Sequence, residues 1–247
     1  MPSSDKKSSQ EAELPQGGTM EEGKPFPCFA FTRADELNGV SEAMDFVEGV
    51  LTDGGASVVY GPSNCGKSFW IVDLGAAVAS GRQFREELEV DRGAVIYVAL
   101  EGSHGAKNRM AALHKKGLLK HGDPFYLIFD QVSLMEKGHA DRLAATVAEV
   151  AKASKHPVKL VIIDTMARAM AGGDENSGVD MGLAVKAIDA VKVATGAHVC
   201  LVHHCGKEAA RGARGHSCLR AAVDTEIEVS RPENETITTV RVTKQRD

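Results

Sequence analysis

The chain has 247 residues, of which 43% are hydrophobic and 26% charged, a composition typical of one α/β domain with a substantial core. The net charge of −5 and a pI near 6.0 give no overall indication of nucleic-acid binding, although a few local cations could still line a pore. Aromatic residues make up 5% of the chain, so a surface that stacks bases would have few members.

The five cysteines are odd in number and form no C-x-x-C pair, which indicates reduced thiols. No apolar run approaches the roughly 18 residues of a membrane span. The N-terminus lacks the hydrophobic core of a secretory signal. We therefore expect a cytoplasmic protein without a membrane partner.

The first 25 residues are rich in Ser, Glu, Lys, Gly and Pro. Such a segment buries too little apolar surface to offset its ordering entropy, which predicts a disordered tail over residues 1–25. Residues 26–247 are expected to form the folded domain. Its lead-in contains Phe46 to Leu51, which we expect to pack against the edge of the core, before a turn at Asp53, Gly54 and Gly55.

Residues 61–68, Gly-Pro-Ser-Asn-Cys-Gly-Lys-Ser, fit the phosphate-binding pattern G-x-x-x-x-G-K-[ST]. A short apolar strand is predicted before the motif and an apolar helix after it, which is the context that a P-loop needs. Lys67 would contact the β- and γ-phosphates, and the Ser68 hydroxyl would ligate Mg²⁺. ATP and Mg²⁺ are the expected cofactors. The predicted nucleotide-binding residues are Gly61, Pro62, Ser63, Asn64, Cys65, Gly66, Lys67, Ser68 and Phe69.

Strands and helices are predicted to alternate along the rest of the chain. This rhythm predicts an α/β fold with a mostly parallel central sheet flanked by helices. The last two predicted strands alternate apolar and polar residues, which indicates an antiparallel hairpin at the sheet edge. The predicted strands are 56–60, 94–100, 125–128, 160–163, 198–202, 225–229 and 236–242, and the predicted helices are 69–79, 106–116, 140–151 and 179–194.

Two carboxylates follow predicted strands. Asp164 ends a hydrophobic strand about 95 residues after the P-loop, at the position where P-loop NTPases hold Mg²⁺, usually through water. Taken alone, such an Asp is more often a helix cap.

Glu101 directly follows the strand predicted at 94–100. If that strand neighbours the P-loop strand, Glu101 points at the γ-phosphate and can act as a general base on the attacking water. The alternative is a solvated or capping Glu.

His203 and His204 follow the strand that ends at Val202. A histidine at the carboxyl end of a strand could donate to a phosphate oxygen and sense hydrolysis. Together with Cys200 and Cys205 the pair could instead indicate zinc. We disfavour zinc because adjacent residues on a strand face opposite ways and no second cluster of ligands follows.

The glycine-rich segment after these histidines carries Lys207, Arg211 and Arg214. One of these cations could reach the γ-phosphate bound by a neighbouring subunit, as an arginine finger, or could touch a nucleic-acid backbone. The simpler interpretation is a solvated loop. Arg220, in a predicted short helix, is a second finger candidate.

Two further positions have simple structural interpretations. Asn176 or Ser177 is expected to cap the helix that begins near Val179, although their loop could face a pore or a neighbouring subunit. Asp224 is expected to be structural.

These motifs together resemble the AAA_25 or RepA-like branch of the RecA-like P-loop ATPases, over about residues 46–247. The best-known members of that branch are hexameric replicative helicases of plasmids, and others are encoded by phages. The residues that carry the resemblance are Phe46 to Leu51, Tyr60 to Ser68, Tyr97 to Gly102, Ile163 to Arg168, Gly173 to Asn176, Val202 to His204, Arg214 to Ser217 and Leu219 to Asp224.

The resemblance implies a RecA-like fold in which Lys67 and Ser68 bind phosphate and Mg²⁺ and Asp164 is the second metal residue. It also implies that Glu101 is the catalytic carboxylate, that His203 or His204 is the γ-phosphate sensor, and that Arg214 is the finger acting between subunits. Two features depart from the family. The plasmid helicases tend to carry two acids where this chain has Glu101 followed by glycine, and relatives continue beyond the final strand. A C-terminal segment of the domain is therefore expected to be missing.

The leading hypothesis is a Mg²⁺-dependent, oligomeric ATPase, expected as a hexameric ring, that moves along single-stranded DNA and works with replication proteins. One alternative is a regulatory ATPase that remodels partner proteins without unwinding DNA. A second is a nucleotide-binding module with little turnover, against which Glu101 argues. A third, a P-loop kinase, lacks an arginine-rich lid and a second substrate pocket in this sequence.

Overall fold

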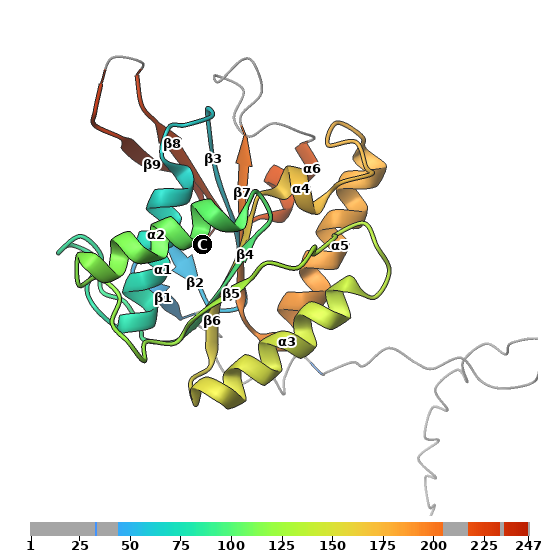
Figure 1. Ribbon diagram of the computed structural model, residues 1–247. Coiled ribbons are helices and arrows are strands. Elements are labelled where there is room, and N and C mark those ends of the chain that lie inside the picture. The colour runs from blue at the N-terminus through green and yellow to red at the C-terminus, as the bar shows by residue number, and fades with distance from the viewer. Residues whose placement is uncertain (1–32, 34–43, 205–216, 233–234, 247) are drawn as a thin grey trace, which may run out of the picture. The chain divides into compact units, whose positions relative to one another are not determined.

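The computed structural model describes residue 33 and residues 44–204, 217–232 and 235–246. Contacts divide the chain into residues 1–42 and residues 43–247. The predicted tail of residues 1–25 lies outside the described residues, so the boundaries predicted for the tail and the domain stay predictions. The second unit contains a seven-stranded sheet in the order β5-β4-β6-β7-β3-β8-β9 (Figure 1).

Six of the seven strands are parallel, and the last pairs antiparallel with the strand before it. This confirms the predicted fold class: a mostly parallel α/β sheet that ends in an antiparallel hairpin. The strands of this sheet are β3 (Ala56–Gly61), β4 (Ala94–Ala99), β5 (Phe125–Ile128), β6 (Val158–Asp164), β7 (His198–His204), β8 (Thr225–Ser230) and β9 (Thr239–Gln245).

Helices cover both faces of the sheet (Figure 1). The first two pack on one face, and the remaining four contribute to the apolar core on the other face. The helices are α1 (Lys67–Ser80), α2 (Ser103–Lys115), α3 (His139–Ser154), α4 (Met166–Ala169), α5 (Gly178–Thr195) and α6 (Ser217–Ala222). Ser177 caps α5, since its hydroxyl accepts a hydrogen bond from the backbone N–H of Asp180.

Strands β3 and β4 are buried along their whole length and β6 at every residue but Lys159, as their apolar runs predict. Alternate side chains enter the two cores. On β6, Leu160 and Ile162 face α1, whereas Val161 and Ile163 face the opposite helices. Asp164 therefore continues the row that faces α1, the helix that follows the P-loop.

A small hairpin of β1 (Asp45–Val47) and β2 (Leu51–Thr52) precedes the main sheet. Its side chains Phe46 and Leu51 are fully buried in the core beneath α1. This confirms the expectation that residues 46–51 pack against the core.

The condition on which the sequence argument for Glu101 depended, that its strand neighbours the P-loop strand, is not met. Strand β4, which precedes Glu101, does not neighbour the P-loop strand β3, because β6 and β7 lie between them. The neighbours of β3 are β7 and β8, so the C-terminal hairpin runs beside the P-loop strand and β9 forms the edge. The sequence does not predict this strand order, because the pattern of an individual strand does not specify which strands pair with it.

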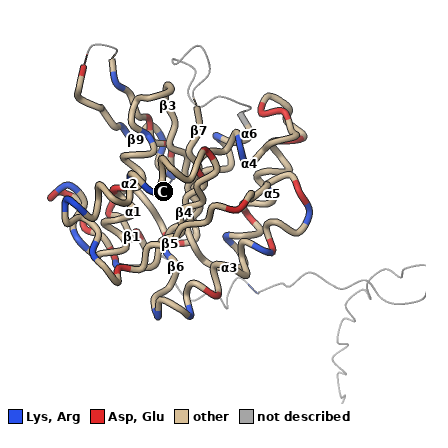
Figure 2. The backbone as a smooth tube through the Cα atoms, in the orientation of Figure 1, with Lys and Arg blue, Asp and Glu red and all other residues tan. Residues whose placement is uncertain are grey.

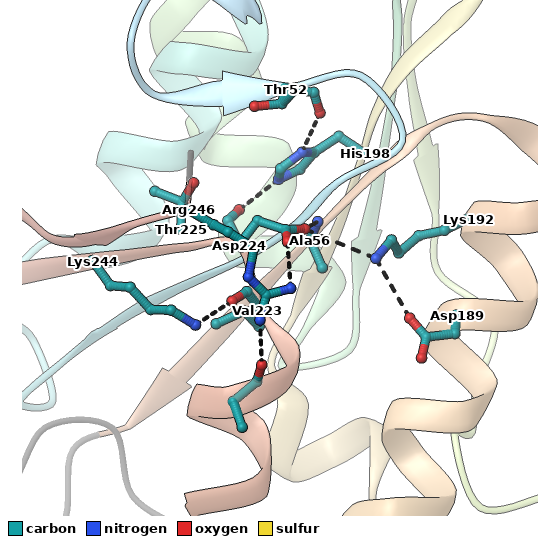
Figure 3. A network of polar contacts seen from close by, with 12 residues as sticks. Thr52, Ala56, Asp189, Lys192, His198, Val223, Asp224, Thr225, Lys244 and Arg246 are labelled. Atoms are coloured by element: carbon teal, nitrogen blue, oxygen red, sulfur yellow. Dashed lines mark hydrogen bonds and ion pairs between the residues drawn. The ribbon is translucent and has the colours of Figure 1, made fainter. Parts of the chain in front are cut away.

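A polar network ties the amino-terminal ends of the strands together (Figure 3). Asp224 accepts a 2.8 Å hydrogen bond from the backbone N–H of Ala56 and forms an ion pair of 3.1 Å with Arg246. Lys192 lies 3.9 Å from the same carboxylate. Asp224 is therefore structural, because it joins the start of the P-loop strand to the C-terminal residues.

Acidic and basic residues are interspersed along the described chain (Figure 2), in agreement with the small net charge. In the part of the chain that the structure describes, no helix is long and apolar enough to cross a membrane.

Candidate functional site

The P-loop joins β3 to α1 through two glycines whose positions admit no larger residue. A Cβ atom on Gly61 would lie 2.0 Å from the carbonyl oxygen of Val229, far inside contact distance. Gly66 precedes α1 with a φ of +106°, a conformation that L side chains rarely adopt. The first N–H groups of α1 have no intrahelical acceptor, so the loop ends in a set of donors suited to an anion.

The loop forms one wall of a cavity of about 580 Å³. Most of the residues predicted from sequence to act at a nucleotide line it, and four others join them: Arg109, Thr165, Val202 and Arg231. The predicted residues that line the cavity are Ser63, Asn64, Gly66, Lys67, Ser68, Phe69, Glu101 and His204. Gly61, Pro62 and Cys65 belong to the same loop but do not line the cavity.

Lys67 is 5% exposed, and its ammonium group lies against the P-loop itself. It donates to the carbonyl oxygens of Gly61 at 2.9 Å and Pro62 at 2.7 Å. Its Nζ atom also lies 3.5 Å from Nδ1 of His204. The positive charge therefore stands at the base of the cavity, beside the first turn of α1.

The strand register separates the two adjacent histidines. His204 pairs with Gly61 in the β3–β7 ladder and lines the cavity. His203 is fully buried, on the opposite face of the strand. Of the two sensor candidates, the structure thus brings only His204 to the P-loop. Its Nε2 atom lies 3.7 Å from Oε1 of Glu101, which places the ring between Glu101 and Lys67.

Glu101 reaches the cavity from β4 across two intervening strands. Its Oε1 atom accepts a 2.8 Å hydrogen bond from the hydroxyl of Thr165, the residue that follows β6. The carboxylate remains about half exposed. Thr165 received no role from the sequence, although its place directly after Asp164 at a strand end was a usable signal.

Asp164 is 2% exposed and lies deeper than Glu101. The hydroxyl of Tyr97 donates a 2.6 Å hydrogen bond to its Oδ2 atom, and Arg109 lies 3.9 Å from the same oxygen. Its Oδ1 atom is buried without a hydrogen-bond partner among the described residues. Sequence reasoning missed both Tyr97 and Arg109, because a tyrosine within an apolar strand and an arginine on a polar helix carry no distinctive pattern.

The C-terminal hairpin supports the P-loop from the other side. Arg231 donates to the carbonyl oxygen of Asn64, and the Thr238 hydroxyl donates to the carbonyl of Cys65 at 3.1 Å. The Cys65 thiol in turn donates to the carbonyl of Val229 at 3.0 Å. These contacts follow from the position of β8 next to β3 and had no sequence signal.

The cationic segment predicted to follow the histidines cannot be placed relative to the cavity. Lys207, Arg211 and Arg214 fall outside the described residues, so the proposed finger stays a prediction. Arg220, the second candidate, is largely exposed and forms an ion pair of 3.2 Å with the buried Glu226, away from the residues that line the cavity.

The AAA_25 family, described as an AAA domain, matches residues 24–210 of the chain. The chain belongs to this AAA domain family. A crystal structure of a KaiC-like protein from the hyperthermophilic archaeon Pyrococcus horikoshii is similar in fold, with a TM-score of 0.51 and 14% identity over 82% of this chain and 84% of that one. This AAA domain thus has a RecA-like P-loop NTPase fold. No protein with a curated description matched it.

The residues of this AAA domain fit a magnesium ion held together with a nucleotide. Ser68 lines the cavity, and Asp164 keeps one buried carboxylate oxygen free of hydrogen bonds from the described residues. Within the described ranges, no three His, Cys, Asp or Glu side chains gather to hold a metal by themselves. That suits Mg²⁺, which usually takes one or two protein ligands and completes its shell with phosphate oxygens and water.

Proposed function

We propose that this protein hydrolyses ATP in a Mg²⁺-dependent reaction at the P-loop cavity. One observation carries the proposal: the carboxylate of Glu101, oriented by Thr165, lines the same cavity as Lys67 and the first turn of α1. A nucleotide-binding module without turnover needs the loop and the lysine, but it has no use for a carboxylate oriented across the cavity.

In this proposal the loop N–H groups and Lys67 bind the β- and γ-phosphates. Ser68 and Asp164 would hold Mg²⁺, which would supply positive charge to the phosphate oxygens. Glu101 accepts a proton from the attacking water or orients it.

His204 is the proposed sensor of the γ-phosphate. Its ring lies within 3.7 Å of Glu101 and 3.5 Å of Lys67, so it could contact the phosphate that those residues serve. Loss of that phosphate would change the contacts of a residue at the end of β7, one residue before the segment that carries Arg214. This provides a short covalent route from hydrolysis to the proposed finger.

A second cavity of about 330 Å³ adjoins the first and shares Gly66, Phe69, Arg109 and Arg231 with it. Its remaining lining includes the apolar side chain of Trp70. Phe69 is 68% exposed beside it, which is unusual for a phenylalanine. We propose that the base and ribose of ATP occupy this second cavity, where Phe69 would offer an aromatic face.

The test is Glu101→Gln in the full chain. We expect ATP turnover to fall by about 10²–10⁴-fold while the dissociation constant of ATP changes little, because the amide keeps the shape of the side chain and loses its basicity. Glu149→Gln, on the exposed surface of α3, is the matched control and should hydrolyse ATP at the wild-type rate. Turnover that survives in Glu101→Gln would refute the assignment of the catalytic carboxylate.

We further propose that the ATPase acts as a homo-oligomer, as a hexameric ring in which Arg214 serves the neighbouring site, and that hydrolysis is coupled to single-stranded DNA and replication proteins. The support is the resemblance to plasmid and phage helicases. Native mass measured with ATP and DNA tests the assembly. Stimulation of turnover by single-stranded DNA tests the coupling, and intact assembly without stimulation would favour a regulatory ATPase that remodels partner proteins.

A further inference from the structure

A buried chain of hydrogen bonds connects α2 to the proposed metal-binding carboxylate. The hydroxyl of Tyr97, which is fully buried on β4, accepts a 2.6 Å hydrogen bond from Nη2 of Arg109 on α2. The same hydroxyl donates at 2.6 Å to Oδ2 of Asp164 at the end of β6. Tyr97 thus stands between a cation and an anion and contacts both.

This arrangement makes the two oxygens of Asp164 unequal. Oδ2 is occupied by the tyrosine, whereas Oδ1 is buried without a hydrogen bond from the described residues. A buried acceptor of this kind is destabilising unless a ligand or a water satisfies it. Oδ1 is therefore the oxygen that would remain available to a Mg²⁺ ion.

The hydroxyl also determines how Arg109 meets Asp164. The guanidinium lies 3.9 Å from Oδ2, close enough for attraction but beyond a hydrogen bond. Arginine and a carboxylate otherwise favour a two-pronged pair that occupies both oxygens. The Tyr97 hydroxyl, which accepts from Arg109 and donates to Oδ2, stands in the place of such a pair.

We propose that Tyr97 is a positioning residue that directs Oδ1 of Asp164 to the metal and keeps Arg109 from pairing with both carboxylate oxygens. The inference rests on the proposed function, since it concerns the metal that ATP hydrolysis requires. It predicts that without the Tyr97 hydroxyl Arg109 pairs with both oxygens of Asp164 and so competes with Mg²⁺ for this carboxylate.

The experiment compares Tyr97→Phe with the wild-type full chain. Binding of a fluorescent ATP analogue is titrated first in EDTA and then at increasing Mg²⁺. We expect the Mg²⁺ concentration at half-saturation to rise about tenfold, the lower end of the effect of mutating a residue that orients a metal ligand, with unchanged binding in EDTA. Tyr126→Phe removes a hydroxyl from β5 on the other face of the sheet and should match the wild type.

A second variant separates positioning from general damage to the fold. In Tyr97→Phe/Arg109→Gln the competing cation is absent, so the Mg²⁺ half-saturation should return toward the wild-type value. A double variant as impaired as Tyr97→Phe would overturn the proposal, and so would a Tyr97→Phe titration that superimposes on the wild type. Equal weakening in EDTA and in Mg²⁺ would also overturn it, because the damage would then lie in the P-loop.

A measurement on folded protein with an intact Tyr97 covers the case in which Tyr97→Phe does not fold. The chain has three tyrosines, so fluorotyrosine labelling gives three ¹⁹F signals, and Tyr60→Phe and Tyr126→Phe identify the signal of Tyr97. We expect that signal to move when Mg²⁺ is added to the nucleotide complex, and a fixed signal would overturn the proposal. If the wild type binds nucleotide without any dependence on Mg²⁺, the proposed function fails as well. If only the Tyr97 tests fail, the proposed function stands.

Discussion

The hydroxyl of Thr165 donates a 2.8 Å hydrogen bond to Oε1 of Glu101 and so joins the ends of β6 and β4 above the P-loop cavity. The proposed general base is therefore oriented by the residue that follows the proposed metal-binding Asp164. Two elements of the site, the base and the metal residue, are linked through one threonine side chain.

Replacement of Thr165 by valine keeps its volume and removes this hydrogen bond. We expect ATP turnover to fall by roughly tenfold, because a carboxylate without its orienting donor spends less time in the productive geometry. The dissociation constant of ATP should change little. Thr165→Ser, which keeps the hydroxyl, serves as the control and should lose less than Thr165→Val. Equal rates in the two variants would contradict the orienting role.

Gly61→Ala should destabilise the fold and not merely the site. The added Cβ would lie 2.0 Å from the backbone carbonyl of Val229, which cannot move without breaking the β3–β8 ladder. We expect the free energy of unfolding, measured in urea, to drop by about 1–3 kcal/mol or more. Gly182→Ala, on α5 with open space around it, should be neutral or stabilising by up to about 1 kcal/mol. Equal stabilities of the two variants would show that the loop relaxes.

The free energy of unfolding should decrease below neutral pH because of His198. Burial, the largest effect on this side chain, lowers its pKa from 6.5 to about 4; Asp224 and Asp53 raise it, and Lys192 lowers it further. Between pH 6.5 and about 4, His198 is therefore mostly protonated in the unfolded chain and mostly neutral in the folded protein. The resulting stability is complete above pH 6.5 and is lost as the pH falls toward 4.

At about 1.4 kcal/mol per pKa unit, this loss amounts to about 3 kcal/mol. Denaturant titrations between pH 8 and pH 4.5 measure it. His198→Asn removes the titrating group, although it also loses the contacts with Thr52 and Ser57, so its stability is lower at neutral pH. Its pH profile should be flatter than that of the wild type. Parallel profiles would assign the acid sensitivity to other groups.

Arg231→Gln should weaken ATP binding. Arg231 lines the cavity and donates to the carbonyl of Asn64, a residue held in a left-handed conformation within the P-loop. The loss of one such hydrogen bond, about 1 kcal/mol, would raise the dissociation constant of ATP roughly fivefold. Arg241→Gln on β9 removes an exposed ion pair with Glu228 and should bind ATP like the wild type. An unaffected Arg231→Gln would indicate that the hairpin does not support the loop.

Local patterns predicted the elements well, because the inner strands are largely apolar runs, the last two strands alternate apolar and polar residues, and several turns carry a glycine. The P-loop and Asp164 were also predictable, because each is recognised from a short run of contiguous residues. The order of the strands was not predictable, because buried strands do not encode their partners in composition, and β4 does not neighbour β3.

The remaining site contacts depend on tertiary geometry. Register with β3 decides that His204 and not His203 faces the cavity. The path of α2 decides that Arg109 meets Tyr97, and the position of β8 decides that Arg231 meets the loop. None of these relations has a local signature, and all of them connect residues far apart in the chain.

The strand order has a consequence for biosynthesis. Both sheet neighbours of the P-loop strand, β7 and β8, are made after β6, so the P-loop strand has no partner in this sheet when Asp164 leaves the ribosome. Strand β7, residues 198–204, pairs with both β6 and β3. It therefore joins the half of the site that carries Glu101 and Asp164 to the half that carries the P-loop. A nascent chain that ends before residue 198 would contain the residues of both halves, but it would lack the strand that brings them together. Under the proposed function, ATP hydrolysis would therefore begin only after β7 has been made.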